Sequence, residues 1–190
     1  DYPSVSEGNL TSLGSEAALI CDTGAEEHFE LGVVSKKGGQ AAIASIEAAT
    51  RLCLNHIVEA IATAPINKEA LKLAGSPFPG HTEMLASLCG ASESLMCFFA
   101  GSLRVFLLTI HVSLADAITA ITKERVAKAI LLADRELRRF GIARPRIAVA
   151  GLNPHAGEHG LFGSEEAREI APAVEESRTR HHIDVSGPFP

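Results

Sequence analysis

Two histidines follow apolar stretches of the chain, at positions where an imidazole could bind a metal ion. His111 follows residues 105–110, and His155 follows residues 146–152. In open α/β sheets, ligands bind beyond the carboxyl ends of strands, and neutral histidine is the commonest ligand of zinc-like ions. His111 and His155 are therefore candidates for a shared divalent-metal site. The alternative is that both are loop histidines bonded to the backbone.

A third histidine, His81, lies in the sequence Pro79-Gly80-His81-Thr82-Glu83, at the expected start of a short helix. Helix N-termini offer unpaired N–H groups and a positive dipole end, and Thr82 adds a hydroxyl. His81 and Thr82 are therefore candidates for binding a phosphate or a carboxylate. A simpler interpretation makes Thr82 an N-cap and Gly80 a turn residue.

Lys68 also follows an apolar stretch, residues 56–64, and is a candidate for the same kind of site. An exposed lysine in a first helical turn is the alternative. The chain contains neither the G-x-G-x-x-G dinucleotide fingerprint nor a G-x-x-x-x-G-K-[ST] loop nor a G-x-S-x-G elbow. No sequence motif therefore assigns residues that would bind a nucleotide cofactor.

His155 and His159 match the H-x-x-E-H signature of a class of zinc proteases. That chemistry requires both histidines on one face of a helix. Pro154, Gly157 and Gly160 disfavour a helix at this place. We therefore set the hydrolase interpretation aside and expect His159 to be exposed in a loop.

Composition excludes several classes of protein. The 190 residues are 46% apolar and 21% charged, and the formal charge of −6, with scattered basic residues, argues against nucleic acid or an anionic membrane as a partner. The chain contains no run of 18 apolar residues, which is the length that predicts a membrane-spanning helix. The cysteines form no C-x-x-C pair, which favours a reducing cytoplasm; they are Cys21, Cys53, Cys89 and Cys97.

The hydrophobic pattern alternates between helices and strands, which predicts an α/β fold with a mixed sheet flanked by helices. The expected helices are residues 39–54, 68–74 with Asn67 as N-cap, 82–88, 122–140 and 164–178 with Ser164 as a candidate cap. The expected strands are residues 56–64, 95–100, 103–110 and 146–152. Gly101-Ser102 predicts an antiparallel hairpin, and the stretch up to Lys37 carries only a weak signal.

Four stretches, in order along the chain, resemble the 4-hydroxythreonine-4-phosphate dehydrogenase family of vitamin B6 biosynthesis. They are TAPINKEAL at 63–71, PGHTE at 79–83, TIHVSL at 109–114 and GLNPHAGE at 151–158. The resemblance implies an α/β/α fold akin to the isocitrate and isopropylmalate dehydrogenases, with a cleft for NAD or NADP that uses no Rossmann fingerprint. It also implies a homodimer whose active sites are shared between subunits.

The resemblance further implies roles for particular residues. His111 and His155 match two of the family's three histidine ligands to a divalent metal, which is zinc, magnesium or cobalt. His81 and Thr82 match the pair that contacts a phosphorylated substrate, and Lys68 is a candidate catalytic residue. The third metal ligand is expected beyond position 190, so residues 1–190 are expected to be the central portion of a larger two-domain enzyme.

The implied reaction is the NAD(P)-linked oxidation of 4-hydroxythreonine 4-phosphate, followed by decarboxylation, in pyridoxal phosphate synthesis. Related dehydrogenases of D-threonate or D-erythronate 4-phosphate are an alternative, as are cis-dihydrodiol dehydrogenases, although His81 and Thr82 favour a phosphorylated substrate. A truncated, non-catalytic module that binds a ligand or metal is a further alternative. The expected protein has no nucleic-acid or membrane partner.

Overall fold

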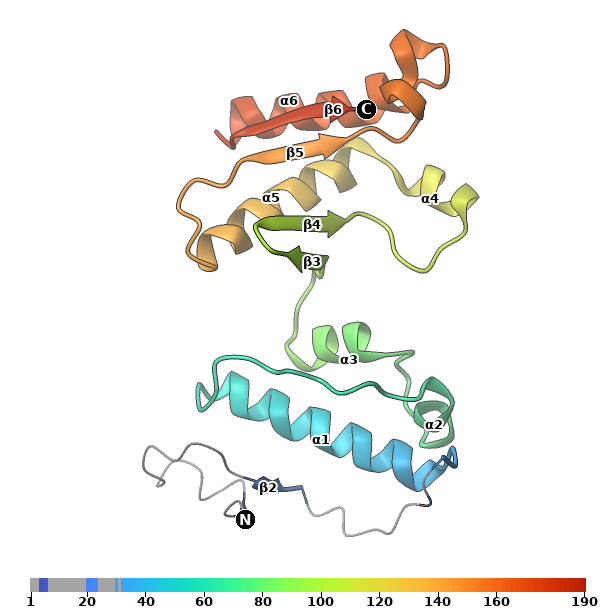
Figure 1. The fold of residues 1–190 in the computed structure, drawn as a ribbon, viewed down its shortest axis with the longest axis vertical. Coiled ribbons are helices and arrows are strands. Elements are labelled where there is room, and N and C mark those ends of the chain that lie inside the picture. Colours follow the sequence, from blue (N-terminus) through green and yellow to red (C-terminus); the bar gives the residue numbers. More distant parts are fainter. Residues whose placement is uncertain (1–3, 7–19, 24–29, 31) are drawn as a thin grey trace. The chain divides into compact units, whose positions relative to one another are not determined.

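The computed structural model describes residues 4–6, 20–23, 30 and 32–190 (Figure 1). The chain divides into two compact units, Asp1–Ser94 and Leu95–Pro190. At the start of the first unit, strands β1 (Ser4–Ser6) and β2 (Ile20–Asp22) pair in parallel. Most of the weakly patterned stretch before Lys37 lies outside the described residues.

Three helices form the rest of the first unit: α1 (Lys36–Leu54), α2 (Lys68–Leu73) and α3 (His81–Leu88). All three were predicted, and the caps explain where two of them begin. The Ser35 side chain accepts the N–H of Gly38, and Asn67 Oδ1 accepts the N–H of Ala70 at 2.9 Å. The helices bury a shared apolar cluster of Ile46, Leu71 and Met84.

The strand predicted over residues 56–64 is wrong. Helix α1 ends in a tight turn, in which His56 has φ +57° and the N–H of Ile57 donates to the carbonyl of Leu52 at 2.9 Å. The first residues of the apolar stretch therefore belong to the left-handed C-terminal cap of α1 and are not extended. The stretch pairs with no strand among the described residues. Its apolar composition alone is therefore not enough to make it a β-strand.

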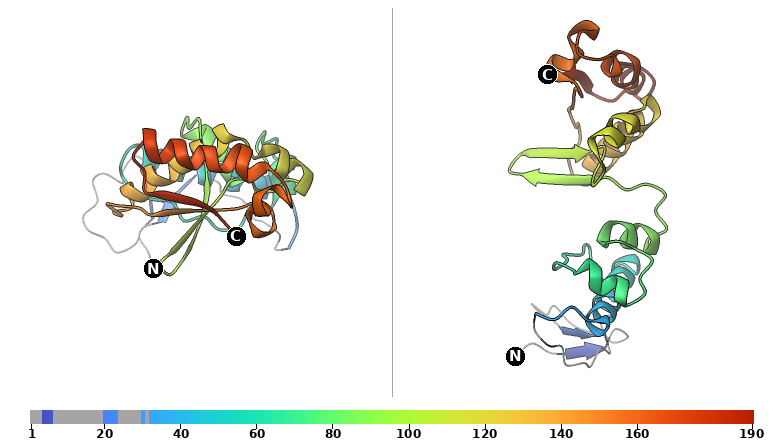
Figure 2. Two further views of the ribbon diagram at one scale, coloured as in Figure 1. Left: turned by 90° about the horizontal axis from the view of Figure 1, so that it is seen from above. Right: turned by 90° about the vertical axis from the view of Figure 1, so that its right-hand side faces the viewer.

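The second unit begins with the predicted hairpin. Strands β3 (Met96–Ala100) and β4 (Leu103–Leu107) pair antiparallel around Gly101-Ser102. Gly101 has φ +58°, which a glycine adopts without strain. The right-hand view of Figure 2 shows the hairpin extending away from the helices of this unit.

Two helices follow the hairpin, of which the sequence predicted only the second. Helix α4 (Leu114–Ala120) is capped by the Ser113 side chain, which accepts the N–H of Asp116. It buries none of its residues, and its seven residues are too few to show a clear helical periodicity in the sequence. Helix α5 (Lys123–Arg139) is capped by Thr122 and buries a stripe of side chains at helical spacing: Val126, Ile130, Ala133 and Leu137.

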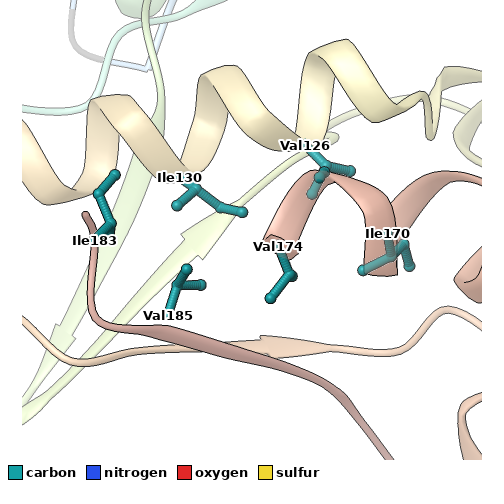
Figure 3. Close-up of a cluster of buried hydrophobic side chains, with 7 residues drawn as sticks. Val126, Ile130, Ile170, Val174, Ile183 and Val185 are labelled. Carbon is teal, nitrogen blue, oxygen red and sulfur yellow. The ribbon is translucent and has the colours of Figure 1, made fainter. Parts of the chain in front are cut away.

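The unit closes with a strand–helix–strand segment. Strands β5 (Ile147–Ala150) and β6 (Val185–Phe189) run parallel, and α6 (Ala171–Arg180) connects them. The sequence predicted β5 and α6 but missed β6. Helices α5 and α6 enclose the core with β6, and Figure 3 shows its side chains: Val126, Ile130, Ile170, Val174, Ile183 and Val185.

The start of the last predicted helix differs from the expectation. A π-helical turn, η3 (Glu166–Ile170), precedes α6, and the Ser164 side chain does not cap it. Instead, the Glu165 carboxylate accepts the N–H of Ser164 at 3.0 Å. Across both units, helices together with parallel and antiparallel strand pairs confirm the α/β class. None of the helices in the described part of the chain is long and apolar enough to cross a membrane.

Candidate functional site

His81 and Thr82 occupy the first turn of α3. Gly80 takes the N-cap position and has no side chain with which to cap the helix. The alternative that Thr82 is the N-cap is therefore wrong, because Thr82 lies inside the helix. Both side chains are half-buried. The helix N-terminus thus combines an imidazole, a hydroxyl and backbone N–H groups, a combination that suits an anion.

Lys68 reaches the same turn from the neighbouring helix α2. A Cβ atom built on Gly80 would lie 3.9 Å from Lys68 Cε and 3.7 Å from a carboxylate oxygen of Glu83. The structure therefore brings Lys68 beside the turn that carries His81, a proximity that sequence spacing alone did not establish. An ammonium group there adds positive charge where the helix dipole already favours an anion.

His111 lies four residues beyond the end of β4, with an exposed side chain and φ +55°. The segment leading to it is held by Arg125 of α5, whose Nη2 donates to the carbonyl oxygen of Leu108 at 3.0 Å. The Ser113 cap of α4 follows directly. This short connection is therefore anchored at both ends around His111.

His155 lies in a left-handed turn beyond β5, labelled η2 (Pro154–Gly160). Its φ is +53°, and every later residue of the turn also has positive φ: Ala156, Gly157, Glu158, His159 and Gly160. For residues other than glycine this region costs about 1–2 kcal/mol each, and such strain gathers at functional sites. A right-handed helix is absent here, so His155 and His159 do not form the H-x-x-E-H protease geometry. His159 is exposed, as expected.

Glu166, which no sequence motif singled out, holds the segment in front of this turn. Its carboxylate accepts the backbone N–H groups of Leu152 at 2.7 Å and Asn153 at 2.6 Å, and the Asn153 side-chain amide at 2.9 Å. Burial acts to raise the pKa of Glu166, but these hydrogen bonds outweigh it and keep the pKa below its ordinary value. The available signal was a pair of acidic residues, Glu165-Glu166, after a glycine-rich loop.

The two candidate metal ligands, His111 and His155, lie in the same unit. His111 and His155 both lie in the second unit, past the ends of β4 and β5, whose arrows point to the same side of the unit in Figure 1. Imidazole nitrogen suits zinc and cobalt, so the donor chemistry fits. Within the described residues, no group of three His, Cys, Asp or Glu side chains gathers to hold a metal. The described chain thus supplies two candidate ligands.

The fold and these side chains define an α/β protein with candidate metal ligands in one unit and a candidate anion-binding turn in the other. The family model described as pyridoxal phosphate biosynthetic protein PdxA matches residues 4–190. The chain therefore belongs to the PdxA family, in agreement with the resemblance found in its motifs.

Individual relatives carry two different enzyme names. The chain is 48% identical to the 4-hydroxythreonine-4-phosphate dehydrogenase of Geobacter metallireducens over 86% of its own length and 48% of the relative's. It is 45% identical to the D-threonate 4-phosphate dehydrogenase of Salmonella typhimurium, over 86% of this chain and 50% of the relative. The chain thus spans about half the length of these curated relatives.

A solved structure supports the fold directly. The crystal structure of 4-hydroxythreonine-4-phosphate dehydrogenase from Klebsiella pneumoniae matches with a TM-score of 0.88 and 41% identity, and the match covers 100% of this chain and 58% of that one. The predicted relation to the isocitrate and isopropylmalate dehydrogenase fold is confirmed through this likeness.

Proposed function

We propose that the protein, in its full length, is a metal-dependent oxidoreductase of pyridoxal phosphate synthesis. Its reaction is the oxidation of 4-hydroxythreonine 4-phosphate by NAD or NADP, followed by decarboxylation. The observation that carries the proposal is the family match over residues 4–190, within which all the predicted site residues lie. We also propose that these residues are the central portion of a larger two-domain enzyme. This proposal is supported by the comparison with the relatives, because the chain covers about half of each.

In this proposal the turn at the start of α3 binds the phosphate of the substrate. His81 and Thr82 contribute an imidazole and a hydroxyl, and the helix N-terminus contributes backbone N–H groups. Lys68 adds a positive charge from α2, as its approach to Gly80 indicates. Binding energy from a phosphate remote from the reacting carbon would then orient the substrate.

In this proposal His111 and His155 would hold a divalent metal ion: zinc, magnesium or cobalt. When bound, such a metal supplies Lewis-acid polarisation of the oxygen at the reacting carbon. Both imidazoles must be neutral at the coordinating nitrogen, and both are exposed to solvent. NAD or NADP takes up the hydride, and the protein's contribution to that step is orientation.

We further propose that the protein is a homodimer with shared active sites and works in the cytoplasm. The dimer follows from the family resemblance. The cytoplasmic location is supported by free cysteines at positions 53, 89 and 97.

Oxidation of D-threonate or D-erythronate 4-phosphate is the second candidate function. It is favoured by relatives named for D-threonate 4-phosphate, whose identity to this chain is close to that of the 4-hydroxythreonine relative. The phosphate-binding turn serves either substrate equally well, so the choice depends on the groups around the reacting carbon.

The test is the reduction of NAD and NADP by the full-length protein with each of the three phosphates, in the presence of zinc, magnesium or cobalt. We expect the highest kcat/KM with 4-hydroxythreonine 4-phosphate. A higher value with D-threonate or D-erythronate 4-phosphate would establish the second candidate. Metal or ligand binding without turnover of any of the three would instead establish a non-catalytic module.

A further inference from the structure

Glu166 is a buried carboxylate that the proposed chemistry does not use. Only 5% of the residue is exposed, at the start of the π-helical turn η3. A buried charge is costly unless its surroundings supply hydrogen bonds. The groups that surround Glu166 therefore indicate what it does.

All three hydrogen bonds to Glu166 come from the segment between β5 and the left-handed turn. One carboxylate oxygen, Oε1, accepts the N–H groups of both Leu152 and Asn153. The other, Oε2, accepts the side-chain amide of Asn153, which also donates to Glu165 at 2.8 Å. The carboxylate thus fixes both the backbone and the side chain of the residues immediately before the turn.

The loop also approaches the carboxylate closely on both sides of His155. A Cβ built on Gly151 would lie 3.3 Å from Glu166 Oε1, and one built on Gly157 would lie 2.8 Å from Oε2. The second distance is shorter than ordinary van der Waals contact, and the φ of Gly157 is +80°. Gly157 therefore permits an approach that a larger residue would prevent.

We infer that Glu166 is a positioning residue for His155. His155 and the non-glycine residues that follow it in the turn adopt left-handed backbone conformations. These conformations are sterically unfavourable, so the turn would relax if nothing held it in place. Glu166 provides that hold from a neighbouring helical turn and fixes where the His155 imidazole is presented. The inference rests on the proposed function in one respect, namely that His155 is a metal ligand.

The test compares Glu166→Gln with Glu169→Gln in the full-length protein. Glu169 lies in the same helical turn, is half-buried, and accepts the N–H of Lys123 at 2.8 Å, but it makes no hydrogen bond to the described residues of the loop. Two quantities are measured in the metal-free protein: amide hydrogen exchange in residues 151–163, and the Kd for added zinc. In Glu166→Gln we expect faster exchange and a Kd raised about 10- to 100-fold, the usual effect of losing a group that orients a ligand. In Glu169→Gln both should stay near the parent values.

A second pair of variants tests the same hold from the loop side, in case Glu166→Gln does not fold. Gly157→Ala places a methyl group against the Glu166 carboxylate, whereas Gly160→Ala meets no atom within 4 Å. Both glycines have positive φ, +80° and +98°, so the backbone strain of the two variants is matched. We expect the zinc Kd to rise markedly more in Gly157→Ala than in Gly160→Ala.

Different results would overturn different parts of the argument. Unchanged exchange in Glu166→Gln, or an equal rise of the Kd in both members of either pair, overturns the positioning role and leaves His155 as a ligand. Zinc binding by His155→Ala at the parent affinity instead overturns the metal assignment, and with it the role of Glu166 toward a metal. The exchange measurement separates these failures because it does not depend on metal.

Discussion

The carboxylate of Glu166 accepts the backbone N–H of Asn153 at 2.6 Å and the side-chain amide of the same residue at 2.9 Å. Asn153 directly precedes the left-handed turn, whereas Glu166 begins the helical segment that leads into α6. One ionised side chain therefore links the loop after β5 to the helix that packs on the core of this unit.

Acid should weaken this link. The pKa of Glu166 is lower in the folded protein than in the unfolded chain. Its contribution to stability is therefore fully present above the unfolded pKa of about 4.3 and is lost as the pH falls through the lower folded pKa. Glu166→Gln should lower the free energy of unfolding by about 1.5–3 kcal/mol near neutral pH, and the difference should shrink in acid. Urea denaturation of both proteins from neutral to acidic pH checks this expectation. A difference in the free energy of unfolding that stays the same at every pH would contradict it.

The contact between α1 and α2 depends on the absence of a side chain at Gly39. A Cβ there would overlap the carbonyl oxygen of Ala70 and lie 2.9 Å from Ala74 Cβ. Gly39→Ala should therefore separate the helices and lower the free energy of unfolding by about 1–3 kcal/mol. Gly38→Ala is the matched control, since its Cβ meets only Ser35 Oγ at 3.3 Å, and it should stay within about 1 kcal/mol of the parent. Urea denaturation distinguishes the two, and equal losses would show that the close approach is not the cause.

Removal of either candidate metal ligand should weaken zinc binding. We expect His111→Ala and His155→Ala each to raise the zinc Kd at least about tenfold, measured by competition with a chelator. His159→Ala is the control, because His159 is exposed in the same left-handed turn as His155. If His159→Ala weakened binding as much as His155→Ala, the assignment of ligands would have to change.

The imidazole at the start of α3 should contribute to substrate binding. His81→Ala should raise the KM for a four-carbon phosphate about tenfold, the effect of losing one hydrogen bond to a charged group. Ser87→Ala, an exposed position at the other end of the same helix, should leave the KM unchanged. Steady-state kinetics with saturating cofactor measures both, and an unchanged KM in His81→Ala would remove the phosphate-binding role.

The position of Lys68 makes a separate prediction. Lys68→Met removes the charge beside Gly80 and keeps a side chain of similar length, so the KM for a phosphorylated substrate should rise about tenfold or more. Lys72→Met removes an exposed charge from the last turn of the same helix and should have little effect. A fall in kcat with unchanged KM in Lys68→Met would instead indicate a role at the reacting carbon.

Local patterns in the sequence predicted most of the helices correctly. Asn67 caps α2, and the apolar stripe of α5 faces the core, because caps and amphipathic periodicity depend on residues within one or two turns. The same reasoning failed where partners are distant. Strand β6 contains Gly187-Pro188, which is typical of a turn, yet it pairs with β5, and Gly187 fits because a Cβ there would overlap the carbonyl oxygen of Val149.

The sequence by itself determined which chemical groups are available and the family to which the motifs point. It identified the imidazoles of His81, His111 and His155, and it excluded a helix around His159, because glycine and proline act locally. Only the tertiary structure decided that Lys68 lies beside Gly80 and that Glu166 holds the loop before His155. Those relationships depend on hydrogen bonds and close approaches between segments distant in the chain, which no local pattern encodes.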